Sequence, residues 1–67
     1  MPKGTVKWFN SDKGFGFIEP DLAGVDLFAD YSQIICHGFK SLECGQRVEF
    51  EILDSPRGAE AVNISIL

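Results

Sequence analysis

The segment KWFNSDKGFGFIEPDLAGVDLFADY (residues 7–31) decides the fold, and it carries six aromatic rings in two short stretches. Aromatic and β-branched residues favour strands, and the Ser-Asp-Lys-Gly sequence within it is typical of a turn. Side chains two apart share one face of a strand. The pattern therefore predicts a strand with Phe15 and Phe17 on one face and Gly16 and Ile18 on the other.

The next aromatic stretch has the same alternation. Leu27 and Ala29 share one face of a predicted strand, and Phe28 and Asp30 share the other. The aliphatic faces are the natural core, so we expect Phe28 to join the outward rings of the preceding strand. Periodicity leaves Trp8 open, because it would fall on the side of Val6 unless a twist or bulge turns it outward.

The rest of the chain also favours strands. Clean alternation predicts one face made of Val48, Phe50 and Ile52, and another made of Val62, Ile64 and Ile66. A short helical turn is expected at 31–34 and a long connection at 35–46. Such a chain predicts a small, partly open all-β barrel, whose closure hides strand edges. The predicted strands are 5–10, 15–19, 25–30, 47–53 and 61–67.

Length and composition restrict the protein class. The 67 residues predict one small domain without room for a deep catalytic cleft. No apolar run approaches the ~20 residues of a membrane-spanning helix, and no leader pattern opens the chain, so we expect a cytoplasmic protein without membrane contact. No nucleophile–base pair, metal cluster or phosphate-cradling loop is recognisable, which predicts no enzyme activity, metal or cofactor. Cys36 and Cys44 are expected to be reduced thiols, with a disulfide or redox switch as the alternative.

Charge is unevenly distributed along the chain. The net charge of −4 alone argues against nucleic acid, since phosphates need lysine and arginine. However, Lys3, Lys7 and Lys13 lie in the first thirteen residues against one acid, Asp12. The basic end is thus the aromatic end. An exposed group of rings beside lysines suits single-stranded nucleic acid, whose bases stack on aromatic side chains. The alternative is a second small core under the long connection.

KGTVKWFNSDKGFGFIEP and DLFADYSQI resemble the two ribonucleoprotein motifs of the bacterial cold-shock proteins. GFKSLECGQRVEFEI and PRGAEAVNI resemble the later part of the same domain, so the resemblance covers essentially the whole chain. It implies one cold-shock domain over residues 1–67, folded as a five-stranded antiparallel OB-type barrel. It also implies a non-catalytic RNA chaperone that binds single-stranded RNA and DNA, preferably pyrimidine-rich, as a monomer or a homodimer. Such a protein melts secondary structure without ATP and modulates transcription or translation.

The resemblance also implies which residues contact nucleic acid. They are stacking or neighbouring rings, cations that contact the backbone, and polar groups that can bond base edges. The rings are Trp8, Phe9, Phe15, Phe17, Phe28, Tyr31 and Phe39. The cations are Lys7, Lys13 and Arg57, and the polar groups are Asn10 and Asp26.

Three positions depart from the family pattern. Asp30 stands where the family usually has histidine, and Tyr31 where it usually has phenylalanine. Ala59 follows Gly58 where proline is usual, which we expect only to loosen the loop. A carboxylate amid phosphates predicts weaker binding, whereas a solvated Asp30 that turns away would have little effect. A divergent member acting through dimerisation or a protein partner is the alternative function.

Overall fold

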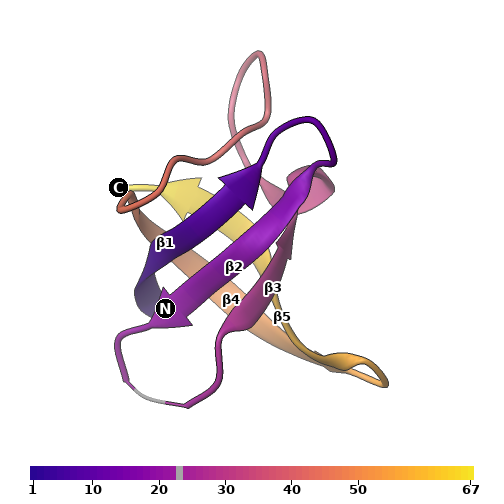
Figure 1. Cartoon of the computed structure of the whole chain (residues 1–67). Helices are drawn as coiled ribbons and strands as arrows, with labels where there is room; N and C mark the ends of the chain where they lie inside the picture. The colour runs from indigo at the N-terminus through magenta and orange to yellow at the C-terminus, as the bar shows by residue number, and fades with distance from the viewer. Residues whose placement is uncertain (23) are drawn as a thin grey trace.

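The protein forms a closed five-stranded barrel with strand order β1-β2-β3-β5-β4 (Figure 1). The structure is a computed structural model that describes residues 1–22 and 24–67. A 3₁₀ turn, η1 (Tyr31–Gln33), follows the third strand, as the sequence predicted. The strands are β1 (Lys3–Asn10), β2 (Phe15–Pro20), β3 (Leu27–Asp30), β4 (Arg47–Ser55) and β5 (Gly58–Ile66).

The all-β barrel prediction is confirmed, and two details of it are corrected. The barrel is closed rather than partly open. Neighbouring strands are antiparallel except β3 and β5, which pair in parallel through Phe28↔Glu60 and Ala29↔Ala61. Five strands in a closed ring cannot reverse direction at every pair, because the number of strands is odd. One parallel pair is therefore a consequence of closure.

A bulge in β1 decides the orientation of Trp8. Val6 pairs with Ile18, but Trp8 pairs with Phe17, so Lys7 is an extra residue in this ladder. A bulge shifts the later side chains to the opposite face. Val6 is consequently buried, while Trp8 is 42% exposed. The question that periodicity left open is resolved in favour of an outward tryptophan.

A second bulge changes the predicted core of β5. Glu51 pairs with Val62 but Glu49 pairs with Ser65, so two residues of β5 stand opposite one of β4. Asn63 takes a positive φ of 51° at this point. Ile64 is fully buried, whereas Ile66 is 42% exposed.

The predicted face of β5 is therefore wrong in part. The bulge lies between Val62 and Ile64 and puts Val62 on the other face. Ala61 lies in the core instead. Ile66 stands opposite the buried Val48 and shares the face of Ile64, but it is the last residue of β5 and is 42% exposed.

On β4 the alternation is unbroken, because the extra residue is on β5. Ile52 stands opposite the buried Ala61 and thus shares the inner face with Val48 and Phe50, although its side chain is 49% exposed.

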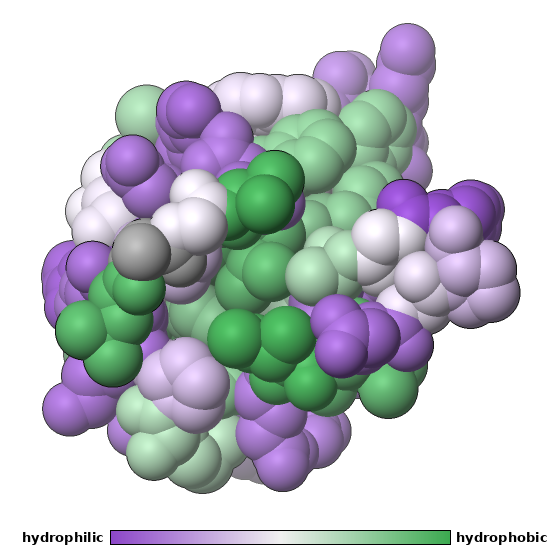
Figure 2. Space-filling model, turned by 90° about the horizontal axis from the view of Figure 1, so that it is seen from below, coloured by the Kyte–Doolittle hydropathy of each residue, from purple (hydrophilic) through white to green (hydrophobic). Residues whose placement is uncertain are grey.

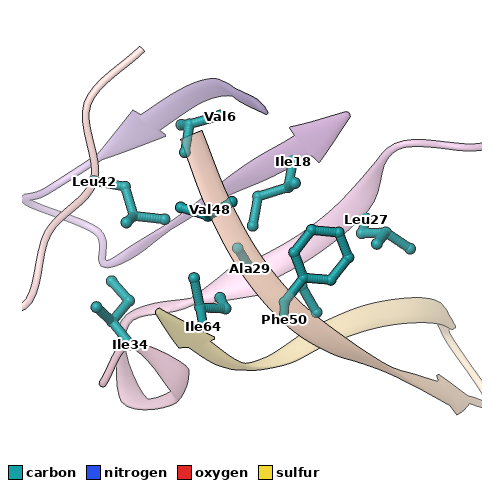
Figure 3. Packing of buried hydrophobic residues seen from close by; sticks show 10 residues of the cluster. Val6, Ile18, Leu27, Ala29, Ile34, Leu42, Val48, Phe50 and Ile64 are labelled. Atoms are coloured by element: carbon teal, nitrogen blue, oxygen red, sulfur yellow. The ribbon is translucent and has the colours of Figure 1, made fainter. Parts of the chain in front are cut away.

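The core fills the barrel with side chains from every strand (Figure 3). Ile34 enters it just after η1, where it bridges to Ile64, and Leu42 enters from the long connection. No helix in residues 1–22 and 24–67 is long and apolar enough to cross a membrane. The buried core residues are Val6, Ile18, Leu27, Ala29, Ile34, Leu42, Val48, Phe50, Ala61 and Ile64.

Candidate nucleic-acid interface

Four rings form a continuous cluster on the outer face of β1, β2 and β3, which we call the ring platform: Trp8, Phe15, Phe17 and Phe28. The Trp8 centroid lies 5.7 Å from Phe15 and 5.4 Å from Phe17. Phe28 stacks on Phe15 at 5.7 Å and meets Phe17 edge-on at 5.9 Å. These spacings are typical of interacting aromatic side chains. The three phenylalanines are half-buried and the tryptophan is exposed, so the rings face outward as predicted and do not form a closed second core.

Strand register places the rings together. Phe17 stands opposite both Trp8 on β1 and Phe28 on β3. Gly16, between the two β2 rings, faces inward and has no room for a side chain. A Cβ there would meet the carbonyl oxygen of Trp8 and would lie 2.7 Å from Cα of Phe9. Glycine thus lets β1 approach β2 closely, which brings the tryptophan against the β2 rings.

Phe9 lies apart from the ring platform. It is half-buried and packs against the barrel core, because the β1 bulge turns Trp8 outward and the next residue inward. The structure therefore does not bring this predicted ring into the platform.

A hollow of about 480 Å³ lies at the loop end of the platform, and we call it the loop hollow. The rings of Tyr31 and Phe39 line it together with Lys13, and Phe39 is 79% exposed. Lys40 also lines this hollow, although sequence reasoning did not select it. The sequence did contain a signal for Lys40, because it directly follows Phe39, a predicted contact ring. The full lining is Ser11, Asp12, Lys13, Gly14, Tyr31, Gly38, Phe39 and Lys40.

The side chain of Asn10 shapes the loop at this end. Its Oδ1 accepts hydrogen bonds from the backbone N–H groups of Asp12 and Lys13, both at 3.0 Å. This is an Asx-type turn. The predicted base-reading oxygen of Asn10 is consequently engaged in holding the β1–β2 loop.

A second hollow, of about 410 Å³, lies at the other end of the platform, and we call it the rim hollow. It brings Arg57, from the β4–β5 turn, beside Phe17 and Phe28. The predicted basic residue at the rim is thus next to the rings despite its distance in sequence. The full lining is Phe17, Val25, Asp26, Phe28, Arg57, Gly58, Ala59 and Glu60.

Among residues 1–22 and 24–67, two ion pairs lie on the outer surface of the barrel. Lys7 Nζ donates to Asp26 Oδ2 at 2.8 Å, and this hydrogen bond raises the pKa of Lys7 above its ordinary value. Arg47 donates to both carboxylate oxygens of Asp21 at 2.8 and 2.6 Å, which lowers the pKa of Asp21. Neither Asp21 nor Arg47 lines the loop hollow or the rim hollow.

Asp30 has a defined structural role. It stands opposite Phe15 in the ladder, and its Oδ2 accepts from the N–H of Ser32 at 3.0 Å and from the Ser32 hydroxyl at 2.5 Å. The carboxylate is therefore the N-cap of η1. A negative charge remains next to the platform, but the side chain is held against the backbone of the turn.

The two cysteines are free thiols. Cys36 Sγ contacts the carbonyl of Phe39 at 3.7 Å, and Cys44 Sγ contacts that of Lys7 at 3.2 Å. The two thiols thus have different partners and are not joined to each other. Across residues 1–22 and 24–67, no three His, Cys, Asp or Glu side chains are grouped so that they could hold a metal ion.

An apolar groove lies at the end of the barrel that holds the N-terminus, and we call it the end groove. Figure 2 shows hydrophobic residues gathered on the face seen from below. Val25 and Ala59 line both this groove and the rim hollow, so the two are continuous. The lining consists of Met1, Pro2, Lys3, Pro20, Asp21, Leu22, Val25, Leu27, Ile52 and Ala59.

Comparison with known proteins assigns the family. Residues 2–67 match the model of the 'Cold-shock' DNA-binding domain. The chain is 52% identical to "Probable cold shock protein A" of Mycobacterium tuberculosis and 54% identical to "Cold shock-like protein CspA" of Bordetella pertussis, in both cases over all of both chains. It is 54% identical to "Major cold shock protein" of Streptococcus pyogenes serotype M1, over 100% of this chain and 98% of that one.

The fold has a counterpart among solved structures. "Drosophila Unr CSD456" superposes with a TM-score of 0.82 at 21% identity, over 98% of this chain and 26% of that one. This likeness supports the OB-type barrel, while the sequence matches extend over the strands and loops that carry the ring platform. The chain belongs to the cold-shock domain family of nucleic-acid-binding proteins.

Proposed function

We propose that this protein is an RNA chaperone that binds single-stranded RNA and DNA across the ring platform and melts secondary structure without ATP. The observation that carries the proposal is the unbroken row of outward rings, with a hollow containing cationic side chains at each end. The whole chain, residues 1–67, would act as one cold-shock domain in the cytoplasm. By opening hairpins it would modulate transcription or translation.

Energetic comparison supports melting of short hairpins in particular. A base stacked on an aromatic side chain gains about 1–3 kcal/mol. A base-pair step in a duplex is worth about 1.4 kcal/mol on average. Platform stacking therefore offsets the loss of only a few base-pair steps. We expect short or mismatched stems to open, whereas long duplexes stay paired.

The proposed contacts follow the geometry of the interface. Bases stack on the ring platform and, at the loop hollow, on Tyr31 and Phe39. Phosphates lie near Lys13, Lys40 and Arg57. Phe9 supports the platform from the core side rather than stacking.

Polar contacts and base preference complete the proposal. Asp26 has one carboxylate oxygen on Lys7 and offers the other, Oδ1, to a base edge in the rim hollow. Asn10 offers its amide N–H₂, since its oxygen holds the loop. Pyrimidine-rich strands would be preferred modestly, through stacking and backbone flexibility rather than base-specific bonds.

Fluorescence titration of Trp8 tests binding directly, because this single tryptophan is part of the platform. A pyrimidine-rich single strand of about eight nucleotides spans one OB-type site. We expect quenching that weakens with salt, and little response to the same sequence as a duplex. Phe28→Ala should weaken binding about 5- to 150-fold, the equivalent of one stacked base. Leu53→Ala, on an exposed residue away from both hollows, is the matched control.

Two outcomes would contradict the proposal. One is the absence of quenching in the wild-type protein up to high micromolar strand. The other is binding without opening of a short-stemmed hairpin labelled at its two ends with a fluorophore and a quencher. An Asp30→His variant measured beside the wild type separates a weakened platform from an absent one, because restored quenching in the variant shows that the rings still accept bases.

A second candidate function is association with another copy of the chain through the end groove. The observation in its favour is the exposure of apolar side chains there, including Leu22 and Val25. Sedimentation of the protein alone across a wide concentration range tests it. A concentration-dependent dimer that Val25→Glu abolishes would support this function, and a monomer throughout would exclude it.

A further inference from the structure

The ion pair between Lys7 and Asp26 crosses the outer surface beside the ring platform. Lys7 is the extra residue of the β1 bulge, directly before Trp8, and Asp26 directly precedes β3 and lines the rim hollow. The two charged atoms lie 2.8 Å apart, with side chains 53% and 33% exposed. The lysine is thus already neutralised at the place where a bound strand would present phosphates.

We infer that Asp26 prevents Lys7 from acting as a phosphate-binding cation, so that Lys13, Lys40 and Arg57 hold the strand instead. The inference rests on the proposed function and differs from the sequence-based prediction, in which Lys7 contacts the backbone. It makes Asp26 a determinant of affinity and of salt dependence. A base-edge contact through the other oxygen of Asp26 is compatible with it.

Exchanging the Asp26 carboxylate for a phosphate would give Lys7 little additional electrostatic attraction. Moving the ammonium from the carboxylate to a phosphate replaces one anion by another at a similar distance, so the gain in attraction is small. The exchange also leaves the Asp26 carboxylate unpaired close to phosphates, where like charges repel. The pair should therefore persist when the strand binds.

Within residues 1–22 and 24–67, the cationic side chains that line the two hollows are not held in an ion pair as Lys7 is. In the part of the chain that the structure describes, the ion pairs involve only Lys7 and Arg47 among the lysines and arginines. Lys13 and Lys40 line the loop hollow and Arg57 lines the rim hollow. Three cations, positioned at both ends of the platform, are available to phosphates without first breaking a pair.

Salt dependence measures the effect of Asp26. For single strands the slope of log K against log salt changes by about 0.7 for each phosphate neutralised. Asp26→Asn removes the charge, keeps the side-chain shape and an acceptor oxygen, and releases Lys7. With an eight-nucleotide oligothymidylate, we expect its slope to be steeper than wild type by about 0.7. A fourfold rise in salt should then cost the variant about 2.6-fold more affinity than it costs the wild type.

The contribution of Lys7 is isolated by combining substitutions. In the Lys7→Ala background, Asp26→Asn should no longer steepen the slope, because no lysine is released. If Lys7→Ala alone makes the slope shallower than that of the wild type by about 0.7, the inference is overturned, since the lysine would then already neutralise a phosphate in the wild type. Equal slopes for the wild type and Asp26→Asn would overturn it as well.

Asp21→Asn is the matched control. It makes the same change in net charge and releases Arg47 from the other ion pair, away from both hollows. We expect little change in its slope. Equal steepening by both asparagine variants would show a general effect of net charge and would overturn the inference. If the wild-type protein binds and Asp26→Asn has the same slope, only this inference is refuted. If the wild-type protein does not bind, the proposed function is refuted.

Discussion

Tyr31 donates its backbone N–H to the carbonyl of Gly14 at 2.9 Å, and its ring lies directly over that glycine. A Cβ on Gly14 would lie 2.7 Å from Cδ1 of Tyr31. Gly14 in turn donates its N–H to the carbonyl of Asn10 at 2.7 Å. The β1–β2 loop therefore positions the ring at the loop hollow through backbone contacts that only a residue without a side chain permits.

Gly14→Ala should destabilise the protein by about 1–3 kcal/mol. The φ of +77° already disfavours a side chain, and the new methyl group would press on the Tyr31 ring. Gly45→Ala is the control, because its φ is +86° but a Cβ there would meet nothing within 4 Å. We expect the control to lose only the backbone term, about 1–2 kcal/mol. Urea unfolding compares them, and a larger loss in the control would contradict a role for the Tyr31 contact.

Two isoleucines of β5 should respond differently to the same substitution, because Ile64 is buried in the core and Ile66 is the exposed last residue of the strand. Ile64→Val should cost about 0.5–1.5 kcal/mol of unfolding free energy, because it removes a methylene group from a fully buried site. Ile66→Val should cost much less, since that side chain is 42% exposed. Equal losses in denaturant unfolding would contradict the difference in burial between the two positions.

Low pH should weaken the ion pair between Asp21 and Arg47. The hydrogen bond from Arg47 lowers the pKa of the Asp21 carboxyl in the folded state. A lowered folded-state pKa contributes stability above the unfolded value of about 3.9, and this contribution is lost as pH falls through the folded value. Wild type should therefore lose more stability than Asp21→Asn between about pH 5 and pH 2. Urea midpoints measured across that range test the difference, which high salt should reduce.

The ring platform was predictable from the sequence because its determinants are local. Phe15, Phe17 and Phe28 lie in strands whose alternation is unbroken, so the period of two assigns their faces correctly. Trp8 required a bulge that the sequence does not mark. The family resemblance, rather than periodicity, indicated that this ring faces outward.

The features that escaped prediction depend on contacts between distant segments. The bulge in β5 lies at Asn63, which has a positive φ at the point where the pairing with β4 shifts register. The Lys7–Asp26 pair joins residues 19 apart in sequence. Counting charges along the sequence does not show that Lys7 is paired, because its carboxylate partner comes close only in the folded chain.

Asp30 combines a structural and an electrostatic role, and two substitutions separate them. Asparagine caps a helical turn about as well as aspartate, while alanine does not cap it. Asp30→Asn should therefore leave stability nearly unchanged, and Asp30→Ala should lose about 0.5–2 kcal/mol by failing to accept from Ser32.

The affinity for nucleic acid measures the effect of the Asp30 charge separately from its role as the N-cap of η1. Both substitutions remove one negative charge from the ladder position opposite Phe15. If this charge repels phosphates, both variants should bind an oligothymidylate more tightly than wild type, by up to about fivefold at low salt, and the gain should shrink as salt rises. Trp8 quenching measures the affinity. Wild-type affinity in Asp30→Asn would mean that the cap holds the carboxylate away from the strand. Tighter binding by both variants, with destabilisation only in Asp30→Ala, would mean that the same side chain both holds η1 and weakens the platform.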